Sequence, residues 1–272
     1  MGDGTLSTVR DAVRPALAGL YSRSAALAAF HRLYWDLRLG LGPDTRVATV
    51  ADLHAEFGVT SRSEHVRVTR FGGERRLLAS LLDTLDGDET VWDVGACIGT
   101  YACFAGKALP DGRVVAVEPE PLNHARLRSN LDRNLPEARW ESHPTALFDS
   151  RTDLRLAAEF QEAGSGHHYL DDEAGIPVAT TTGTALVDSG VPAPDVVKID
   201  VQGAETQVIR GMAELLGGVE LIYLEVHEQK LERYGSSTDR VEALLRDQGF
   251  ELEHLGTPST NRSGVYFLRA TR

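Results

Sequence analysis

Two acidic side chains flank a glycine turn in the stretch where the chemistry is best specified. Asp93 lies within the apolar run 91–94, Gly95 follows it, and Glu118 comes 25 residues after Asp93. Gly95 permits a tight turn and a close approach of the backbone to a ligand. A carboxylate at Asp93 repels phosphate but suits a positively charged ligand, and Glu118 can accept hydrogen bonds from both hydroxyls of a ribose. The spacing therefore predicts a site for a cationic nucleoside.

A dinucleotide site is the main alternative for this stretch. Its fingerprint is G-x-G-x-x-G, whereas residues 95–99 read GACIG and lack the middle glycine that lets a pyrophosphate approach the backbone. Asp93 counts further against phosphate, although a ribose acid such as Glu118 is shared with NAD enzymes. S-adenosylmethionine (SAM), which carries an ammonium and a sulfonium, fits these residues better than NAD does.

The surrounding pattern alternates strands with helices. Residues 91–94 and 114–117 predict two buried strands, joined by a helix that starts at Gly99 and stops before the sequence PDG at 110–112. A right-handed crossover places such strands side by side, with the ligand at their carboxyl ends. Further strands are predicted at 140–143, 154–157, 195–200 and 219–226, further helices at 73–85, 121–134, 203–216 and 238–248, and an antiparallel pair at 250–254 and 265–269.

Three ordered motifs, DVGACIGT, AVEPEPLNHARLRSNLDRN and VVKIDVQGAE, resemble the FkbM-type family of SAM-dependent methyltransferases, over about residues 93–229. The resemblance implies an α/β fold of the Rossmann-like class I type. We expect a seven-stranded, mostly parallel sheet with an antiparallel terminal strand pair, helices on both faces and a helical N-terminal extension. It also implies in-line O-methylation of a hydroxyl on a small or glycan-linked metabolite. An NAD-dependent oxidoreductase and a non-catalytic SAM-binding module are the alternatives.

The same resemblance assigns the site. It implies that Glu118 binds the ribose, that Ala146 and Leu147 lie along the adenine, and that the turn holds the methionine end. The full expected cofactor set is Asp93, Gly95, Ala96, Gly99, Thr100, Glu118, Pro119, Ala146 and Leu147. The expected catalytic residues are Asp200, Glu205 and His227. Thr184 stands where the family often has an aspartate, so it receives no catalytic role.

The catalytic roles have structural alternatives. Glu205 can simply stabilise the N-terminus of its helix. His227 can be a base or a hydrogen-bonded structural residue. A divalent metal at Asp200 is compatible with a hydroxyl substrate, but the ligand spacing does not demand one, so no metal is predicted.

The composition limits the classes of partner that we expect the protein to bind. The net charge is −12, and residues 1–80 carry 11 arginines and 8 acidic residues, a net +3, which leaves −15 for the remainder. An acidic catalytic region is a poor match for a phosphate backbone, so we expect no nucleic-acid substrate. Only three of the 28 basic residues are lysines, a composition typical of high-salt cytoplasm, although high-GC codon usage also favours arginine.

No segment predicts export or a membrane span. No apolar run reaches the roughly 20 residues that cross a bilayer, and the N-terminus lacks a signal-peptide pattern. Cys97 and Cys103 fit neither a metal pair nor a disulfide framework. We therefore expect a cytoplasmic protein, and its oligomeric state is left open.

The chain divides into an extension and a catalytic domain. Residues 1–70 predict a helical N-terminal extension, with a break at Pro15 and a short hairpin before Thr69, and residues 71–272 predict the methyltransferase domain. The first helices are basic and amphipathic, so peripheral membrane contact is an alternative to packing on the domain. Residues 161–175 are polar and glycine-rich and predict a loop that contacts the substrate.

Overall fold

The computed structural model describes residues 34–35, 44–158, 163–166, 168–171, 173–257 and 264–272. Its contacts divide the chain into two compact units, Met1–Asp44 and Thr45–Arg272. The helices predicted before residue 40 lie outside the described residues, apart from 34–35. Residues 45–70 belong to the second unit, and the domain boundary predicted at residue 70 stays a prediction.

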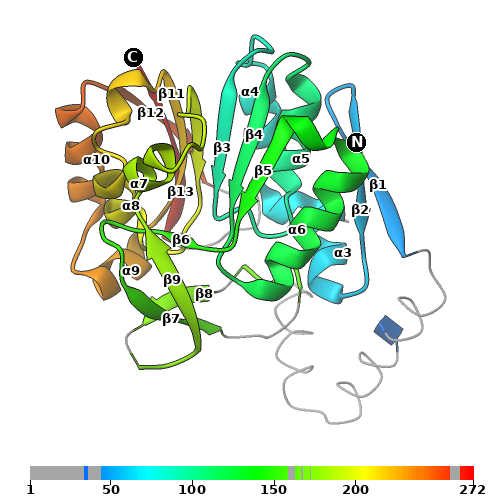
Figure 1. Ribbon diagram of the computed structural model, residues 1–272, viewed down its shortest axis with the longest axis horizontal. Helices are drawn as coiled ribbons and strands as arrows, with labels where there is room; N and C mark the ends of the chain where they lie inside the picture. The colour runs from blue at the N-terminus through cyan, green and yellow to red at the C-terminus, as the bar shows by residue number, and fades with distance from the viewer. Residues whose placement is uncertain (1–33, 36–43, 159–162, 167, 172, 258–263) are drawn as a thin grey trace, which may run out of the picture. The chain divides into compact units, whose positions relative to one another are not determined.

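A seven-stranded sheet forms the centre of this unit (Figure 1), in the order β12-β13-β11-β10-β3-β4-β5. Its strands are β3 (Thr90–Val94), β4 (Arg113–Val117), β5 (Trp140–His143), β10 (Val196–Ile199), β11 (Leu221–His227), β12 (Glu251–Gly256) and β13 (Val265–Thr271). The five strands from β11 to β5 are parallel, and β13 is antiparallel to both β11 and β12. The predicted sheet and its antiparallel terminal pair are confirmed.

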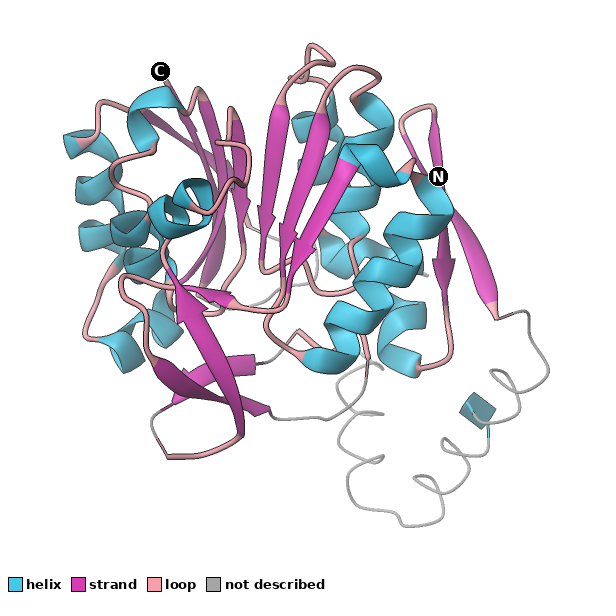
Figure 2. Cartoon of the chain, in the orientation of Figure 1, coloured by secondary structure: helices cyan, strands magenta, loops and turns pink. Residues whose placement is uncertain are grey.

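Helices cover both faces of this sheet (Figure 2). One side carries α4 (Arg75–Leu82), α5 (Thr100–Ala108) and α6 (Pro121–Asn134), and the other carries α7 (Gly183–Asp188), α8 (Glu205–Gly211) and α10 (Thr238–Asp247). Successive side chains of a strand point to opposite faces of the sheet. Each strand therefore contributes apolar side chains to the packing on both faces. Trp92 and Val94 of β3 join Val208 of α8 and Leu245 of α10 in the larger cluster of buried apolar residues.

A hairpin and a helix precede the sheet. The hairpin consists of β1 (Thr45–Val50) and β2 (Leu53–Gly58), and the helix α3 (Arg62–Arg70) runs into the 3-10 helix Phe71–Gly73. Ser61 and Glu64 form a reciprocal capping box that fixes the start of α3. The rings of Phe57 and Phe71 each lie 6.0 Å from the ring of Phe104, so this segment packs on α5.

A second, four-stranded sheet was not predicted. It has the order β6-β9-β7-β8, from β6 (Ala146–Leu147), β7 (Asp153–Ala158), β8 (His168–Asp171) and β9 (Ile176–Thr181). The prediction of a loop across 161–175 is therefore wrong for 168–171, because β8 pairs with β7 there. Leu156, Leu170 and Val178 form a small buried apolar cluster with Ala146, so each strand of this sheet contributes one side chain to it.

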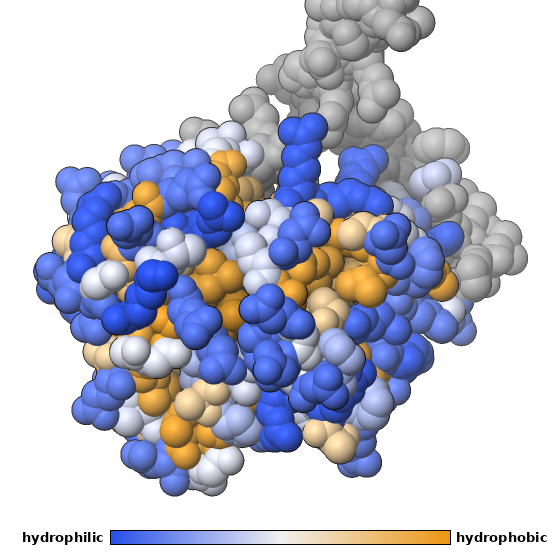
Figure 3. Space-filling view, turned by 90° about the horizontal axis from the view of Figure 1, so that it is seen from above, coloured by the Kyte–Doolittle hydropathy of each residue, from blue (hydrophilic) through white to orange (hydrophobic). Residues whose placement is uncertain are grey.

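The remaining short elements complete the described chain. They are α9 (Glu228–Leu231) and the 3-10 helices Glu137–Arg139, Leu216–Gly218 and Glu232–Tyr234. None of the helices that the structure describes has the length and apolar character required to cross a membrane. Viewed from above in Figure 3, the surface is mainly hydrophilic, with hydrophobic residues showing in a band between polar ones.

Candidate active site

Glu118 lies at the carboxyl end of β4 with its carboxylate fixed by backbone donors. Its Oε2 accepts a hydrogen bond from the Cys97 amide at 2.8 Å, and its Oε1 accepts one from the Glu120 amide at 2.9 Å. The residue is buried, and burial raises its pKa to about 7 despite these bonds. A carboxylate held so rigidly is prepared to accept further hydrogen bonds from a ligand's hydroxyls.

An apolar cavity opens beside this carboxylate. Its walls include Glu118, Pro119, Ala146, Leu147, Leu156 and Leu170. The walls come from the end of β4 and from β6, β7 and β8, which explains why the second sheet matters to the site. A flat, largely apolar ring fits such a lining, and the carboxylate of Glu118 fits a ribose. Four of these residues were expected from the sequence; Leu156 and Leu170 were not.

A polar cavity lies on the other side of the turn after β3. Its walls include Ala96, Thr100, Tyr101, Lys198, Glu74 and Phe71. Within the part of the chain that the structure describes, the buried hydroxyls of Thr100 and Tyr101 have no hydrogen-bond partner. Buried polar groups are normally satisfied, so these two hydroxyls point to a polar ligand. Only Ala96 and Thr100 of this set were expected to bind the cofactor.

Three residues line both cavities, namely Arg67, Gly95 and Asp200. Gly95 adopts φ 78°, and a Cβ atom added there would lie 1.9 Å from the carbonyl oxygen of Asp200. The turn after β3 therefore touches the end of β10 only because residue 95 has no side chain. A ligand that spans both cavities passes this contact.

Asp93 does not line either cavity as the described residues outline them. Its Oδ2 accepts a hydrogen bond from the Ala102 amide at 3.0 Å, and its Oδ1 lies 3.2 Å from Lys198 Nζ. Burial opposes charge on Lys198, but Asp93 and Asp200 outweigh it and raise the lysine pKa above its ordinary value. Asp93 therefore supports the turn and holds a lysine at the polar cavity. Gly99, at the start of α5, also lines neither cavity as the described residues outline them.

Asp200 directly follows β10 and lines both cavities. Lys198 Nζ lies 3.9 Å from Oδ2, His227 Nε2 lies 3.8 Å from Oδ1, and Gln202 Nε2 donates to Oδ1 at 2.6 Å. Burial alone would raise the pKa of Asp200, but Lys198 and His227 lower it to about 2. Asp200 is therefore a carboxylate at any physiological pH.

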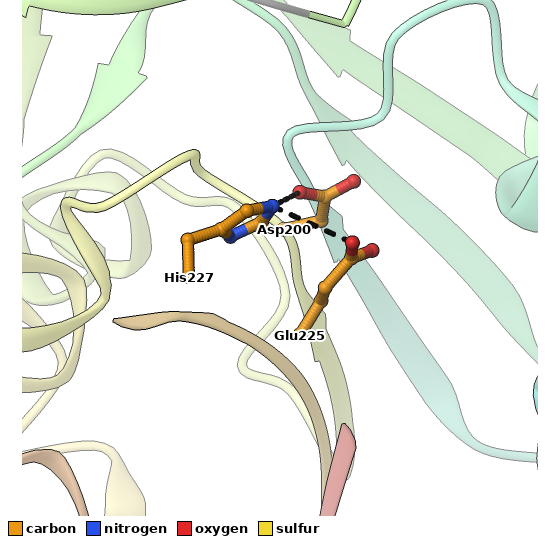
Figure 4. A group of neighbouring side chains, drawn as sticks. All are labelled: Asp200, Glu225 and His227. Carbon is orange, nitrogen blue, oxygen red and sulfur yellow. Dashed lines mark ion pairs between the residues drawn. The ribbon is translucent and has the colours of Figure 1, made fainter. Parts of the chain in front are cut away.

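His227 and Glu205 form a buried pair behind Asp200 (Figure 4 shows His227 with Asp200 and Glu225). His227 Nδ1 lies 2.9 Å from Glu205 Oε1, and Nε2 lies 3.4 Å from Glu225 Oε1. Burial lowers the pKa of His227, but its bonds to Glu205 and Glu225 outweigh this and raise it to about 9. A pKa raised in this direction does not suit a general base, which was one of the two roles that the sequence allowed for His227.

A clamp holds one wall of the apolar cavity. Asn123 of α6 donates from Nδ2 to the carbonyl of Ser165 at 2.9 Å and accepts from the Gly164 amide at 2.8 Å. Arg67 Nε donates to the Gly164 carbonyl at 3.2 Å. Ser165, Gly166 and His168 line the cavity, while His167 lies outside the described residues. Sequence reasoning missed both residues: Asn123 lies within the second motif but was given no role, and Arg67 lies in the segment assigned to the extension.

Comparisons with known proteins agree with this geometry. Residues 93–252 match the family model described as the methyltransferase FkbM domain. The hexuronic acid methyltransferase AglP of Haloferax volcanii is 31% identical over 79% of this chain and 90% of its own length. The 2-O-methyltransferase NoeI of Sinorhizobium fredii is 26% identical over 57% of this chain and 70% of its own length.

The chain is also similar to a third methyltransferase. The 31-O-demethyl-FK506 methyltransferase FkbM of Streptomyces tacrolimicus is 25% identical over 60% of this chain and 72% of its own length. The predicted cofactor SAM and the predicted methyltransferase activity are thereby confirmed. The family model covers well over half of the chain, and this protein belongs to the FkbM family of methyltransferases.

Proposed function

We propose that this enzyme transfers the methyl group of SAM to a hydroxyl of a sugar, either free or glycan-linked, and that the sugar carries a carboxylate. The observation that carries the proposal is the position of Asp200, an ionised side chain shared by the apolar and polar cavities. The place where the two cavities meet is where the sulfur between the nucleoside and amino-acid halves of SAM would lie.

The residues present fit SAM at both ends. Glu118 would accept the ribose hydroxyls, and the apolar walls at Ala146 and Leu147 would enclose the adenine. The free hydroxyls of Thr100 and Tyr101 would donate to the carboxylate of the methionine end. When bound, SAM supplies an activated methyl group that is displaced in line, so the protein's main task is to align the acceptor.

Asp200 is suited to orient the acceptor hydroxyl. A carboxylate with a pKa near 2 is a weak base, but it accepts a strong hydrogen bond from a hydroxyl and so directs the oxygen toward the methyl group. The proton becomes far more acidic as the new O–C bond forms, and Asp200 can then receive it. General-base assistance of this kind contributes typically about 10²–10⁴-fold.

The names of the relatives support the acceptor class. They mention a hexuronic acid, a 2-O position and a 31-O position. Arg67 lines both cavities and places a positive charge beside Asp200, which suits an acceptor that carries a carboxylate. We therefore put uronic-acid glycosides ahead of neutral hexosides as acceptors.

The test measures ligand binding and transfer separately. Calorimetry with SAM, S-adenosylhomocysteine and NAD should give binding only for the first two. Trideuteromethyl SAM is then incubated with uronic-acid and neutral hexosides, and mass spectrometry before and after alkaline hydrolysis distinguishes a stable methyl ether from a methyl ester. Asp200→Asn should lose turnover while binding SAM, with Glu242→Gln on α10 as the unaffected control. Alkali-labile products alone, or binding of NAD in place of SAM, would contradict the proposal.

A further inference from the structure

Three side chains with metal-binding atoms converge at Asp200, one of the three residues that line both cavities. We call these three residues, Arg67, Gly95 and Asp200, the shared wall. Asp200 follows β10, and Glu225 and His227 lie at the end of the neighbouring strand β11 (Figure 4). His227 Nε2 lies 3.4 Å from Glu225 Oε1 and 3.8 Å from Asp200 Oδ1, and one ligand atom from each residue falls within 4.8 Å of the others. A cation with bonds of about 2.0–2.2 Å separates its ligands by about 3–4 Å, and both distances from His227 fall in that range.

Glu205 prepares His227 for this role from the opposite side. Its Oε1 lies 2.9 Å from His227 Nδ1, and the Gly203 amide donates to the same oxygen at 3.1 Å. A metal-binding histidine usually donates its second ring N–H to a carboxylate, which fixes the ring and turns the other nitrogen to the ion. Glu205 is fully buried and lines neither cavity as described, so its contact with His227 is the function that its position supports.

Gln202 occupies the space between this cluster and the apolar cavity. Its Nε2 lies 2.6 Å from Asp200 Oδ1 and 2.9 Å from His227 Nε2, while Lys230 Nζ donates to its Oε1. Gln202 also lines the apolar cavity and has φ 57°, a conformation that non-glycine residues rarely adopt. Turning the amide over would aim its oxygen at the same point as the three other ligand atoms, at the cost of the Lys230 bond.

The types of donor atom in the cluster indicate which ion it would hold. One imidazole with two carboxylates favours a first-row ion such as Mn²⁺ or Zn²⁺ over Mg²⁺, which prefers an all-oxygen shell.

We propose that Asp200, Glu225 and His227 bind one divalent metal ion, with Glu205 as the positioning residue, and that this ion holds the acceptor hydroxyl at the shared wall. The role of the ion in holding the acceptor hydroxyl rests on the proposed function, whereas the metal site itself does not. A coordinated hydroxyl is more acidic than a free one. Its proton would pass to the carboxylate oxygen of Asp200 that does not bind the ion, the hydroxyl oxygen would form the bond to the methyl carbon, and the sulfur of SAM would keep the electrons of the broken S–C bond.

The test begins with metal alone. Full-length protein, freed of its tag and stripped with a chelator, is titrated with Mn²⁺ and the free ion is followed by electron paramagnetic resonance, with Zn²⁺ titrated by calorimetry. We expect one site per chain. Asp200→Asn, Glu225→Gln and His227→Gln should each weaken it more than about 100-fold, and Glu205→Gln by about 10–100-fold. The control is Glu242→Gln. Glu242 Oε1 also pairs with a histidine, lying 3.2 Å from Nε2 of the exposed His254, but this pair is not part of the cluster, so metal uptake should be unchanged.

Two further measurements separate the possible outcomes. If a variant fails to fold, pulsed resonance on the wild type must still detect coupling between Mn²⁺ and an imidazole nitrogen, and its absence overturns the site. Uptake that is not saturable, or that survives in all three ligand variants, also overturns it. SAM binding and methyl transfer without metal uptake would refute this inference while leaving the proposed function intact. A metal site without transfer to any hydroxyl would support the site and refute the acceptor role.

Discussion

Lys198 Nζ lies 3.2 Å from Asp93 Oδ1, and the two residues are directly paired in register between β10 and β3. This contact gives the acid before the glycine turn a different role from the one expected. Asp93 accepts a hydrogen bond from the Ala102 amide in α5 and lines neither cavity as described. The pairing of β3 with β10, which no single segment of sequence reveals, brings Asp93 and Lys198 together.

Asp93→Asn should therefore act first on stability. It removes the nearest partner of a buried ammonium, and losing one half of such a pair costs about 3–5 kcal/mol. The free energy of unfolding in urea measures this, with the exposed Asp83→Asn as control. A loss below about 0.5 kcal/mol would mean that Asp200 alone compensates Lys198.

Glu118 should couple cofactor binding to pH. Its pKa in the free protein is raised to about 7, and ribose hydroxyls favour the ionised form. SAM binding near pH 7 should release a proton from Glu118, and affinity should fall as the pH drops below 7. Because the pKa is raised, ionisation of Glu118 destabilises the free protein, whose stability should decline as pH rises through 7.

Calorimetry in two buffers with different heats of ionisation measures that proton. Glu118→Gln should abolish the release and weaken SAM binding by roughly 2–4 kcal/mol through lost charge-assisted bonds. Equal heats in both buffers for the wild type would show that Glu118 is already ionised and would refute the coupling.

Gly95→Ala should separate the turn from β10. The added methyl group would lie 1.9 Å from the carbonyl oxygen of Asp200, in addition to the strain at φ 78°. Gly190 is a matched control, because it has φ 103° but no described atom within 4 Å of an added Cβ. Gly190→Ala should cost about 1–2 kcal/mol of stability and leave SAM affinity unchanged. Gly95→Ala should cost more and abolish SAM binding, as measured by unfolding and calorimetry; equal effects would remove the special role of this contact.

Asn123→Leu should release residues 163–166. It deletes two buried hydrogen bonds to that segment, so amide hydrogen exchange there should accelerate and SAM affinity should fall about tenfold or more. Asn130→Leu on the same helix is the comparison, since Asn130 bonds to Gly58 and Ile98 instead. Asn130→Leu should destabilise the packing of the β1–β2 hairpin on α6 without accelerating amide hydrogen exchange at 163–166. Identical exchange in both variants would contradict the clamp.

The main sheet was predictable because its strands are short apolar runs separated by strongly marked helices. Helix α6 and strand β5 have the predicted bounds, and every strand of the main sheet was anticipated within a few residues. The second sheet was not, because β8 and β9 mix polar, aromatic and proline residues, and their pairing depends on distant β7. Sequence alone does not reveal which segments will meet in that way.

The site was predictable in part for the same reason. Glu118, Pro119, Ala146 and Leu147 line the apolar cavity as the motifs implied. Arg67 was missed because it lies in the segment assigned to the extension. A base was considered for His227 because its contact with Glu205, which comes from α8, is not visible in the sequence. Local motifs identify functional side chains, whereas their protonation depends on contacts made by the whole fold.

The clamp on residues 163–166 grips the main chain. Ser61, Arg67 and Asn123 bind carbonyl and amide groups of Ala163, Gly164 and Ser165, and none of these bonds uses a side chain of the clamped segment. A substitution at position 165 can therefore alter the cavity wall while its anchorage persists. Such an arrangement lets the side chains of this wall vary between relatives while the backbone that carries them keeps its place.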